Sequence, residues 1–181
     1  MNARQLVLDT LEGRPTPRVP VAPMAVHICA RFAGISLHRY TKDATVLADA
    51  VIRLWERFHP DAVFVSADTW VTAQAMGARV GPIAEDQPWG GMGEPLVRSA
   101  FDVKRILPPD PATQGRFPLM LAALRRVSAV LGRDAAIVAC FDQFPFSLAA
   151  ALMGINDLML GLEDDPGLVQ RSALAAKPDL W

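Results

Sequence analysis

The sequence predicts an α/β fold with parallel strands, because short apolar runs alternate with longer amphipathic helices. Residues 62–66 and 135–140 are continuous apolar runs, as in strands buried on both faces of a sheet. Residues 46–58 and 117–131 repeat apolar side chains at helical spacing. A buried strand that leads into a helix is a βα unit, and such units place ligands at the carboxyl ends of their strands.

The remaining expected elements are short. In the first half they are a helix around Val7, Leu8 and Leu11, a strand over 19–24, a helical stretch near Ala30, and Thr41 as N-cap of the helix over 46–58. In the second half they are a helix over 70–76, a strand or helix over 97–106, and helices over 146–153, 156–162 and 166–175. Residues 78–115 are rich in Gly and Pro, which predicts mostly irregular structure.

The length of 181 residues predicts one domain over residues 1–181. Two architectures fit the pattern, an open doubly wound sheet and a (β/α)8 TIM barrel. A complete barrel typically needs about 250 residues, and three clear strands cannot close one. The ending at residues 177–181 has no obvious final strand, which favours the N-terminal portion of an incomplete barrel.

Composition excludes several function classes. A net charge of -1 gives no general attraction to nucleic acid or to an anionic membrane. The sequence contains no run of about 18 apolar residues, so we expect no membrane span. Asp9, Glu12 and Arg14 interrupt the apolar core that an N-terminal signal peptide would need. We therefore expect a cytoplasmic protein in which the two cysteines, Cys29 and Cys140, are free thiols.

The two strand-to-helix junctions carry the candidate site residues. Asp68 and Asp142 each follow a predicted strand, where a carboxylate can bind a ligand or cap the next helix. Aromatic side chains near the same junctions could line a site for a flat macrocycle, or belong to the core; they are Trp70, Trp89, Phe144 and Phe146.

His27 and Cys29 suggest a further possibility. In an extended segment, residues i and i+2 point to the same face, so this pair could bind zinc with Cys140 as a third ligand. A free Cys is more commonly a small buried apolar residue, and we predict no metal site in this chain.

A series of short segments, in order along the chain, resembles the uroporphyrinogen decarboxylase superfamily. They are residues 11–15 and 18–21, 58–63, 66–68, 74–78, 107–111, 115–118 and 145–149, followed by Gly154 and by Asp165-Pro166. The resemblance implies the first half of a (β/α)8 barrel with its site at the carboxyl ends of the strands. One branch of the superfamily decarboxylates uroporphyrinogen, and another transfers methyl groups between corrinoid carriers and thiols with the help of zinc.

The resemblance also assigns roles to residues. Asp68 matches the aspartate that contacts pyrrole nitrogens in the decarboxylases, and we expect it to be catalytic. The decarboxylases have an arginine-rich loop after the first strand, where this chain has only Arg31. Gln143-Phe144 replaces an expected glycine, Ala151 stands where a tyrosine is expected, and the single tyrosine, Tyr40, lies elsewhere.

These departures favour the methyltransferase branch, with tetrapyrrole decarboxylation as the alternative. Expected substrate-binding residues are Arg31, Trp70, Asp142, Phe144 and Phe146. The methyltransferase reading implies zinc and a corrinoid as cofactors of the full-length enzyme, with zinc ligands in a His-x-Cys pair and a later Cys of the second half-barrel. Expected partners are a tetrapyrrole or a corrinoid protein, and a second copy or a complementing C-terminal half. A third possibility is a non-catalytic half-barrel that needs a partner chain.

Overall fold

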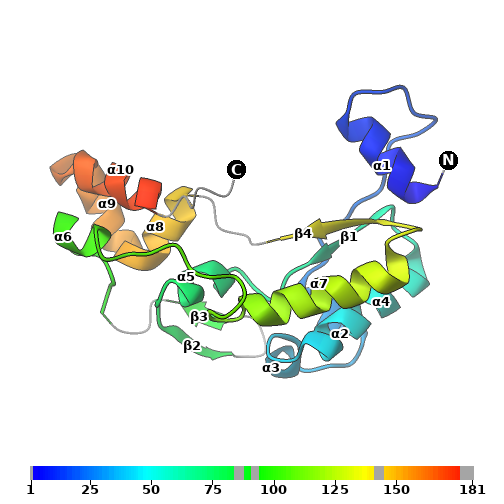
Figure 1. The fold of residues 1–181 in the computed structure, drawn as a ribbon, viewed down its shortest axis with the longest axis horizontal. Helices are drawn as coiled ribbons and strands as arrows, with labels where there is room; N and C mark the ends of the chain where they lie inside the picture. The colour runs from blue at the N-terminus through cyan, green and yellow to red at the C-terminus, as the bar shows by residue number, and fades with distance from the viewer. Residues whose placement is uncertain (1, 84–87, 91–93, 141–144, 176–181) are drawn as a thin grey trace. The chain divides into compact units, whose positions relative to one another are not determined.

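A computed structural model of the chain describes residues 2–83, 88–90, 94–140 and 145–175 (Figure 1). The chain folds into two compact units. The first is built mainly from Met1–Asp68 and Leu119–Cys140, and the second mainly from Thr69–Ala84, Pro88–Pro118 and the residues after 140. The mixed helix and strand composition agrees with the predicted α/β class.

The first unit contains a parallel pair of strands, β1 (Ala62–Val65) and β4 (Ala136–Ala139). Ala62 lies opposite Ala136, and Val65 lies opposite Ala139. The prediction of parallel strands is therefore confirmed. Within the described residues this sheet has two strands, and its hydrogen bonds continue beyond β4 where the Cys140 N–H donates to the Val65 carbonyl across 3.1 Å.

The helices of this unit are α1 (Ala3–Leu11), α2 (His27–Phe32), α3 (Leu37–Tyr40), α4 (Ala44–Phe58) and α7 (Phe117–Leu131), whose first two residues belong to the second unit. Helix α4 packs on β1, and α1 contacts both strands (Figure 1). The apolar periodicity explains this packing, because Leu47, Val51 and Leu54 face the interior.

The N-cap prediction for α4 is wrong. Asp43, not Thr41, precedes the helix, and its carboxylate accepts hydrogen bonds from the Thr45 and Val46 N–H groups at 2.8 and 3.2 Å. Thr41 is buried at the end of α3, and its hydroxyl donates to the carbonyl of Leu37, the first residue of that helix.

The strand expected over residues 19–24 is also absent. Val19, Val21 and Met24, which belong to the apolar pattern that predicted the strand, are exposed. Pro20 and Pro23 lack the N–H groups that a strand needs. Val21 of this segment instead makes two hydrogen bonds with Asp61: the Asp61 N–H donates to the Val21 carbonyl across 2.8 Å, and the Val21 N–H donates to the Asp61 carboxylate across 2.7 Å.

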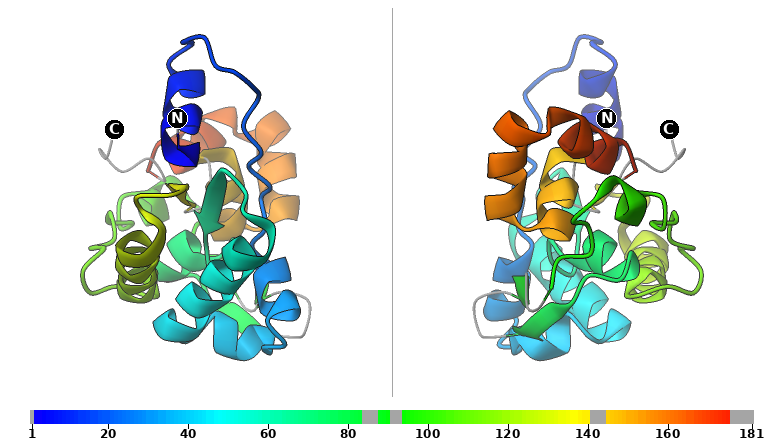
Figure 2. Two further views of the ribbon diagram at one scale, coloured as in Figure 1. Left: turned by 90° about the vertical axis from the view of Figure 1, so that its right-hand side faces the viewer. Right: turned by 90° about the vertical axis from the view of Figure 1, so that its left-hand side faces the viewer.

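The second unit is mainly helical. Its elements are α5 (Val71–Ala75), an antiparallel pair β2 (Val80–Ile83) and β3 (Pro88–Gly90), α6 (Ala100–Val103), α8 (Pro145–Met153), α9 (Ile155–Asp164) and α10 (Pro166–Ala175). Helices α8, α9 and α10 pack against one another (Figure 2). Leu148, Leu152 and Leu158 form the centre of their apolar core. The β2–β3 pair lies in the stretch predicted to be irregular.

Among the described helices, none alone has the length and apolar character of a membrane span. Helices α8 and α9 meet that description only when taken together, and they are bent by 107° at their junction.

Candidate functional site

The candidate site lies at the carboxyl end of β1, in the segment from Ser66 to Asp68. Because β1 and β4 are parallel, both strands end at the same edge of the sheet. Asp68 follows β1 by three residues, and Cys140 follows β4 directly. Ser66 is fully buried and Asp68 is 2% exposed. Burying a carboxylate costs free energy unless it is hydrogen-bonded, so we expect the fold to hold the Asp68 side chain in a defined position.

Three side chains bind the backbone of this segment. The Tyr40 hydroxyl donates to the Ser66 carbonyl across 2.9 Å, and the Ala67 N–H donates to the Met120 sulfur across 3.2 Å. The His27 Nε2 lies 2.9 Å from the Ala67 carbonyl oxygen. A carbonyl only accepts hydrogen bonds, so Nε2 must carry the hydrogen. The segment before Asp68 is therefore bound from α2, α3 and α7.

The rings of His27 and Tyr40 also contact each other. They meet edge to face, with centroids 6.3 Å apart and an interplanar angle of 88°. Tyr40 has no exposed surface, whereas His27 is half-buried. The two donors that bind the segment thus stabilise one another.

Helix α5 begins after Trp70, its N-cap residue, whose side chain makes no capping hydrogen bond. Asp68 stands two residues before this N-cap, and ligand binding and capping both stay open for it. The catalytic role of Asp68 stays a prediction.

The other predicted site residues lie in different surroundings. Arg31 is exposed in the last turn of α2, in the same unit as Asp68. Trp70 packs partly buried against the apolar core of the second unit, and Phe146 is 49% exposed in the first turn of α8. Asp142 and Phe144 lie outside the described residues, as does the side chain of Trp89. The binding roles of these residues stay predictions.

The zinc possibility built on His27 and Cys29 rested on an extended segment, and this is wrong. Both residues lie in helix α2, where positions i and i+2 face different directions. Cys29 is 1% exposed, its thiol donates to the Ala25 carbonyl across 2.8 Å, and burial raises its pKa to about 12. Such a thiol is protonated and unsuited to metal binding.

No group of three or more His, Cys, Asp or Glu side chains that could bind a metal occurs in the part of the chain that the structure describes. These residues do not fit the zinc ion that the family resemblance implies for the full-length enzyme.

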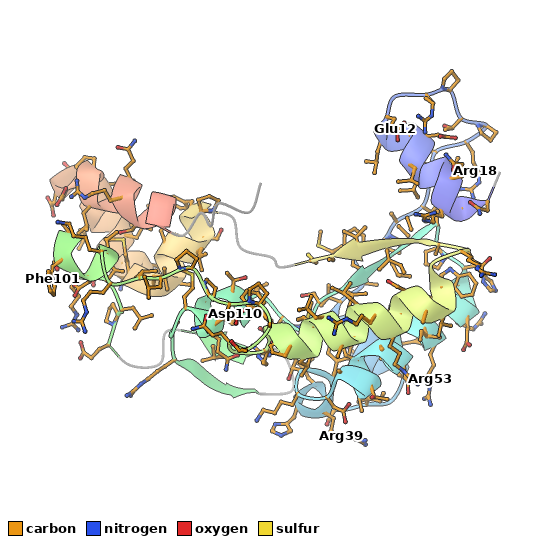
Figure 3. All side chains as sticks on the ribbon, viewed as in Figure 1. Glu12, Arg18, Arg39, Arg53, Phe101 and Asp110 are labelled. Atoms are coloured by element: carbon orange, nitrogen blue, oxygen red, sulfur yellow. The ribbon has the colours of Figure 1, made fainter. Side chains whose placement is uncertain are left out.

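An ion pair stabilises the opposite end of β1. Asp61 directly precedes the strand, and both of its carboxylate oxygens accept hydrogen bonds from Arg18 at 2.6 Å. Figure 3 labels Arg18 on the segment that follows α1. The Arg18 hydrogen bonds are the main reason that the pKa of Asp61 lies below its ordinary value; burial opposes them, and the Val21 N–H adds to them.

Sequence reasoning missed the residues that bind the Ser66–Asp68 segment. His27 was considered only as a metal ligand, Tyr40 only as a tyrosine in an unexpected place, and Met120 only as a helix residue. No pattern along the sequence marked Tyr40, because its full burial, which requires a partner for the hydroxyl, is visible only in the structure.

Comparisons with known proteins agree on the family. The family model described as uroporphyrinogen decarboxylase (URO-D) matches residues 2–173. Among solved structures the chain is similar to a methyltransferase from Methanosarcina mazei, with a TM-score of 0.83 and 20% sequence identity over 97% of this chain. The match covers 52% of that protein, so the chain spans about half of its length. A comparison with curated proteins finds no match. Because the family model matches nearly the whole chain, this protein belongs to the uroporphyrinogen decarboxylase superfamily, which includes methyltransferases.

Proposed function

We propose that this chain is the N-terminal portion of a (β/α)8 barrel of the methyltransferase branch, which transfers a methyl group between a corrinoid carrier and a thiol. The observation that carries the proposal is the buried Asp68, held at the carboxyl end of a parallel strand where barrel enzymes place their sites. The likeness to a solved methyltransferase supports the choice of branch.

Asp68 would bind the ligand rather than react with it. A carboxylate accepts hydrogen bonds from N–H groups and is stronger in this role when water is excluded. A corrinoid carries amide side chains that can donate such bonds. Asp68, which follows a backbone segment bound by His27, Tyr40 and Met120, would therefore fix the position of the ligand.

In the proposed reaction, a methyl group carried by a corrinoid would be transferred to a thiol, and Asp68 would accept hydrogen bonds from the corrinoid amides and hold the ligand in place. Zinc, where bound, would supply a thiol that is deprotonated at neutral pH. The described residues do not fit zinc, so the proposal assigns zinc ligands to residues other than these.

Tetrapyrrole decarboxylation is the second candidate function. Asp68 favours it, because a carboxylate at this position can accept hydrogen bonds from pyrrole N–H groups and stabilise positive charge on the ring. The decarboxylases bind the substrate carboxylates with an arginine-rich loop, and here Arg31 alone stands near that position. This difference favours methyl transfer over decarboxylation.

A half-barrel that works only with a partner chain is the third candidate. Within the described residues, β1 and β4 each pair only with the other, so a further strand from another chain could extend the sheet. The partner would be a second copy or a complementing C-terminal half.

One experiment separates these candidates. The full chain is incubated with methylcobalamin, 2-mercaptoethanesulfonate and zinc, alone and mixed with the part of the Methanosarcina mazei methyltransferase that this chain does not match. Loss of methylcobalamin absorbance with equimolar thioether, reduced by Asp68→Asn, supports methyl transfer. Carboxyl loss in a parallel incubation with uroporphyrinogen, without methyl transfer in the first incubation, supports the second candidate. Absence of both reactions, with and without the added protein, would contradict both enzymatic candidates.

A further inference from the structure

His27 is distant from Asp68 in the sequence, but its side chain binds the backbone next to Asp68. It stands at the start of α2, forty residues before Ala67, and its Nε2 donates to the Ala67 carbonyl across 2.9 Å. Ala67 is the residue directly before Asp68. The hydrogen bond therefore acts on the peptide group that joins Ala67 to Asp68.

A peptide group is planar, so fixing the direction of its carbonyl also fixes the direction of the next N–Cα bond. His27 thereby fixes the peptide plane that leads into Asp68. The preceding plane, between Ser66 and Ala67, is bound at both ends, because Tyr40 binds its carbonyl and Met120 binds its N–H. Both peptide planes before Asp68 are thus oriented by side chains.

We propose that His27 is a positioning residue of the Asp68 site, which orients the Asp68 carboxylate through the Ala67–Asp68 peptide plane. The role of the imidazole requires only its Nε2–H, so a side chain that donates from the same place can replace it. The identity of the ligand at Asp68 rests on the proposed function, whereas the positioning role rests on the hydrogen bond itself.

Three substitutions in the full chain test the role. His27→Leu removes the donor at similar size, and His27→Gln keeps an N–H donor at similar reach. His38→Leu is the matched control, because His38 is exposed on α3. Affinity for methylcobalamin and for uroporphyrin is measured from the change in visible absorbance. We expect His27→Leu to weaken binding about tenfold, His27→Gln to restore it, and His38→Leu to have no effect.

A double-mutant cycle separates positioning from a general effect on stability. In the Asp68→Asn background, His27→Leu should weaken binding no further, because the group it orients has been altered. An equal loss in both backgrounds, or no loss in the wild-type background, would overturn the proposal.

A second readout keeps the test independent of the ligand. If the unaltered chain binds neither probe, the ligand assignment of the proposed function fails, and the NMR signal of the Asp68 carboxyl carbon decides about His27. We expect His27→Leu to shift this signal and His38→Leu to leave it in place. A signal that stays unchanged in His27→Leu would overturn the positioning role.

Discussion

The Tyr40 hydroxyl donates a hydrogen bond to the Ser66 carbonyl across 2.9 Å, which links helix α3 to the end of strand β1. Tyr40 has no exposed surface, and Ser66 is fully buried. This bond, together with those of His27 and Met120, places Asp68 at the edge of the parallel pair. The single tyrosine of the chain thus contributes to the candidate site through the backbone.

Tyr40→Phe should destabilise the protein by about 1 kcal/mol, because it keeps the ring but removes the hydroxyl that donates a hydrogen bond to the buried Ser66 carbonyl. Urea unfolding followed by circular dichroism measures the change. Thr45→Ala is the control, since the Thr45 side chain is exposed on α4, and it should shift the unfolding free energy by no more than about 0.5 kcal/mol. Equal stability of Tyr40→Phe and the unaltered chain would contradict the role given to this bond.

The Arg18–Asp61 pair predicts a loss of stability in acid. The folded-state pKa of Asp61 is lowered chiefly by hydrogen bonds from Arg18, so the pair contributes fully above the unfolded pKa of about 4. Its contribution is lost as the pH falls through the lower, folded-state pKa. The free energy of unfolding should therefore decrease with falling pH in this window.

Asp61→Asn tests this origin of the pH dependence. The variant should be less stable at neutral pH and should show a shallower decrease in acid. Asp164→Asn, at an exposed position of α9, should keep the slope of the unaltered chain. The same slope in Asp61→Asn and the unaltered chain would show that other groups cause the acid dependence.

Gly115→Ala should be clearly more harmful than Gly13→Ala. Both glycines have a positive φ, of 57° and 70°, which costs an alanine about 1 kcal/mol. An added Cβ at Gly115 would also lie 2.9 Å from the Ala75 Cα, whereas nothing lies within 4 Å at Gly13. We expect an extra 1–3 kcal/mol at Gly115, roughly, from this overpacking. Thermal unfolding measures both variants, and equal losses would contradict the close approach of Gly115 to α5.

We predict that the isolated chain associates or has poor solubility. Strands β1 and β4 each lack a second strand neighbour within the described residues, and unpaired strand edges favour pairing with another chain. Size-exclusion chromatography with light scattering measures the oligomeric state over a range of concentrations. A soluble monomer that unfolds cooperatively would contradict this prediction.

The sequence predicted the longest elements well, for reasons visible in particular residues. Helix α7 begins and ends at the predicted residues 117 and 131, because its apolar periodicity is strong over four turns. Strands β1 and β4 lie within the two continuous apolar runs. The prediction of a strand over residues 19–24 was wrong, because two prolines in this apolar segment lack the N–H groups that a strand donates.

The sequence predicted only the part of the candidate site that can be recognised from neighbouring residues in the chain. Asp68 was identified because it lies shortly after a predicted strand and matches the aspartate of the family that the sequence resembles. His27 and Tyr40 act through backbone carbonyls 40 and 26 residues away, and no short-range pattern in the sequence encodes such a contact. The zinc possibility at His27 and Cys29 failed for a different, local reason, since it assumed an extended segment where the chain forms helix α2.

The most direct test of the account is the affinity of the full chain for methylcobalamin before and after Asp68→Asn. The account predicts saturable binding that falls about ten- to a hundredfold in the variant, because a charged hydrogen-bond acceptor is replaced by a neutral amide. Absence of binding, or equal affinity in the two proteins, would contradict the claim that Asp68 forms part of a corrinoid site.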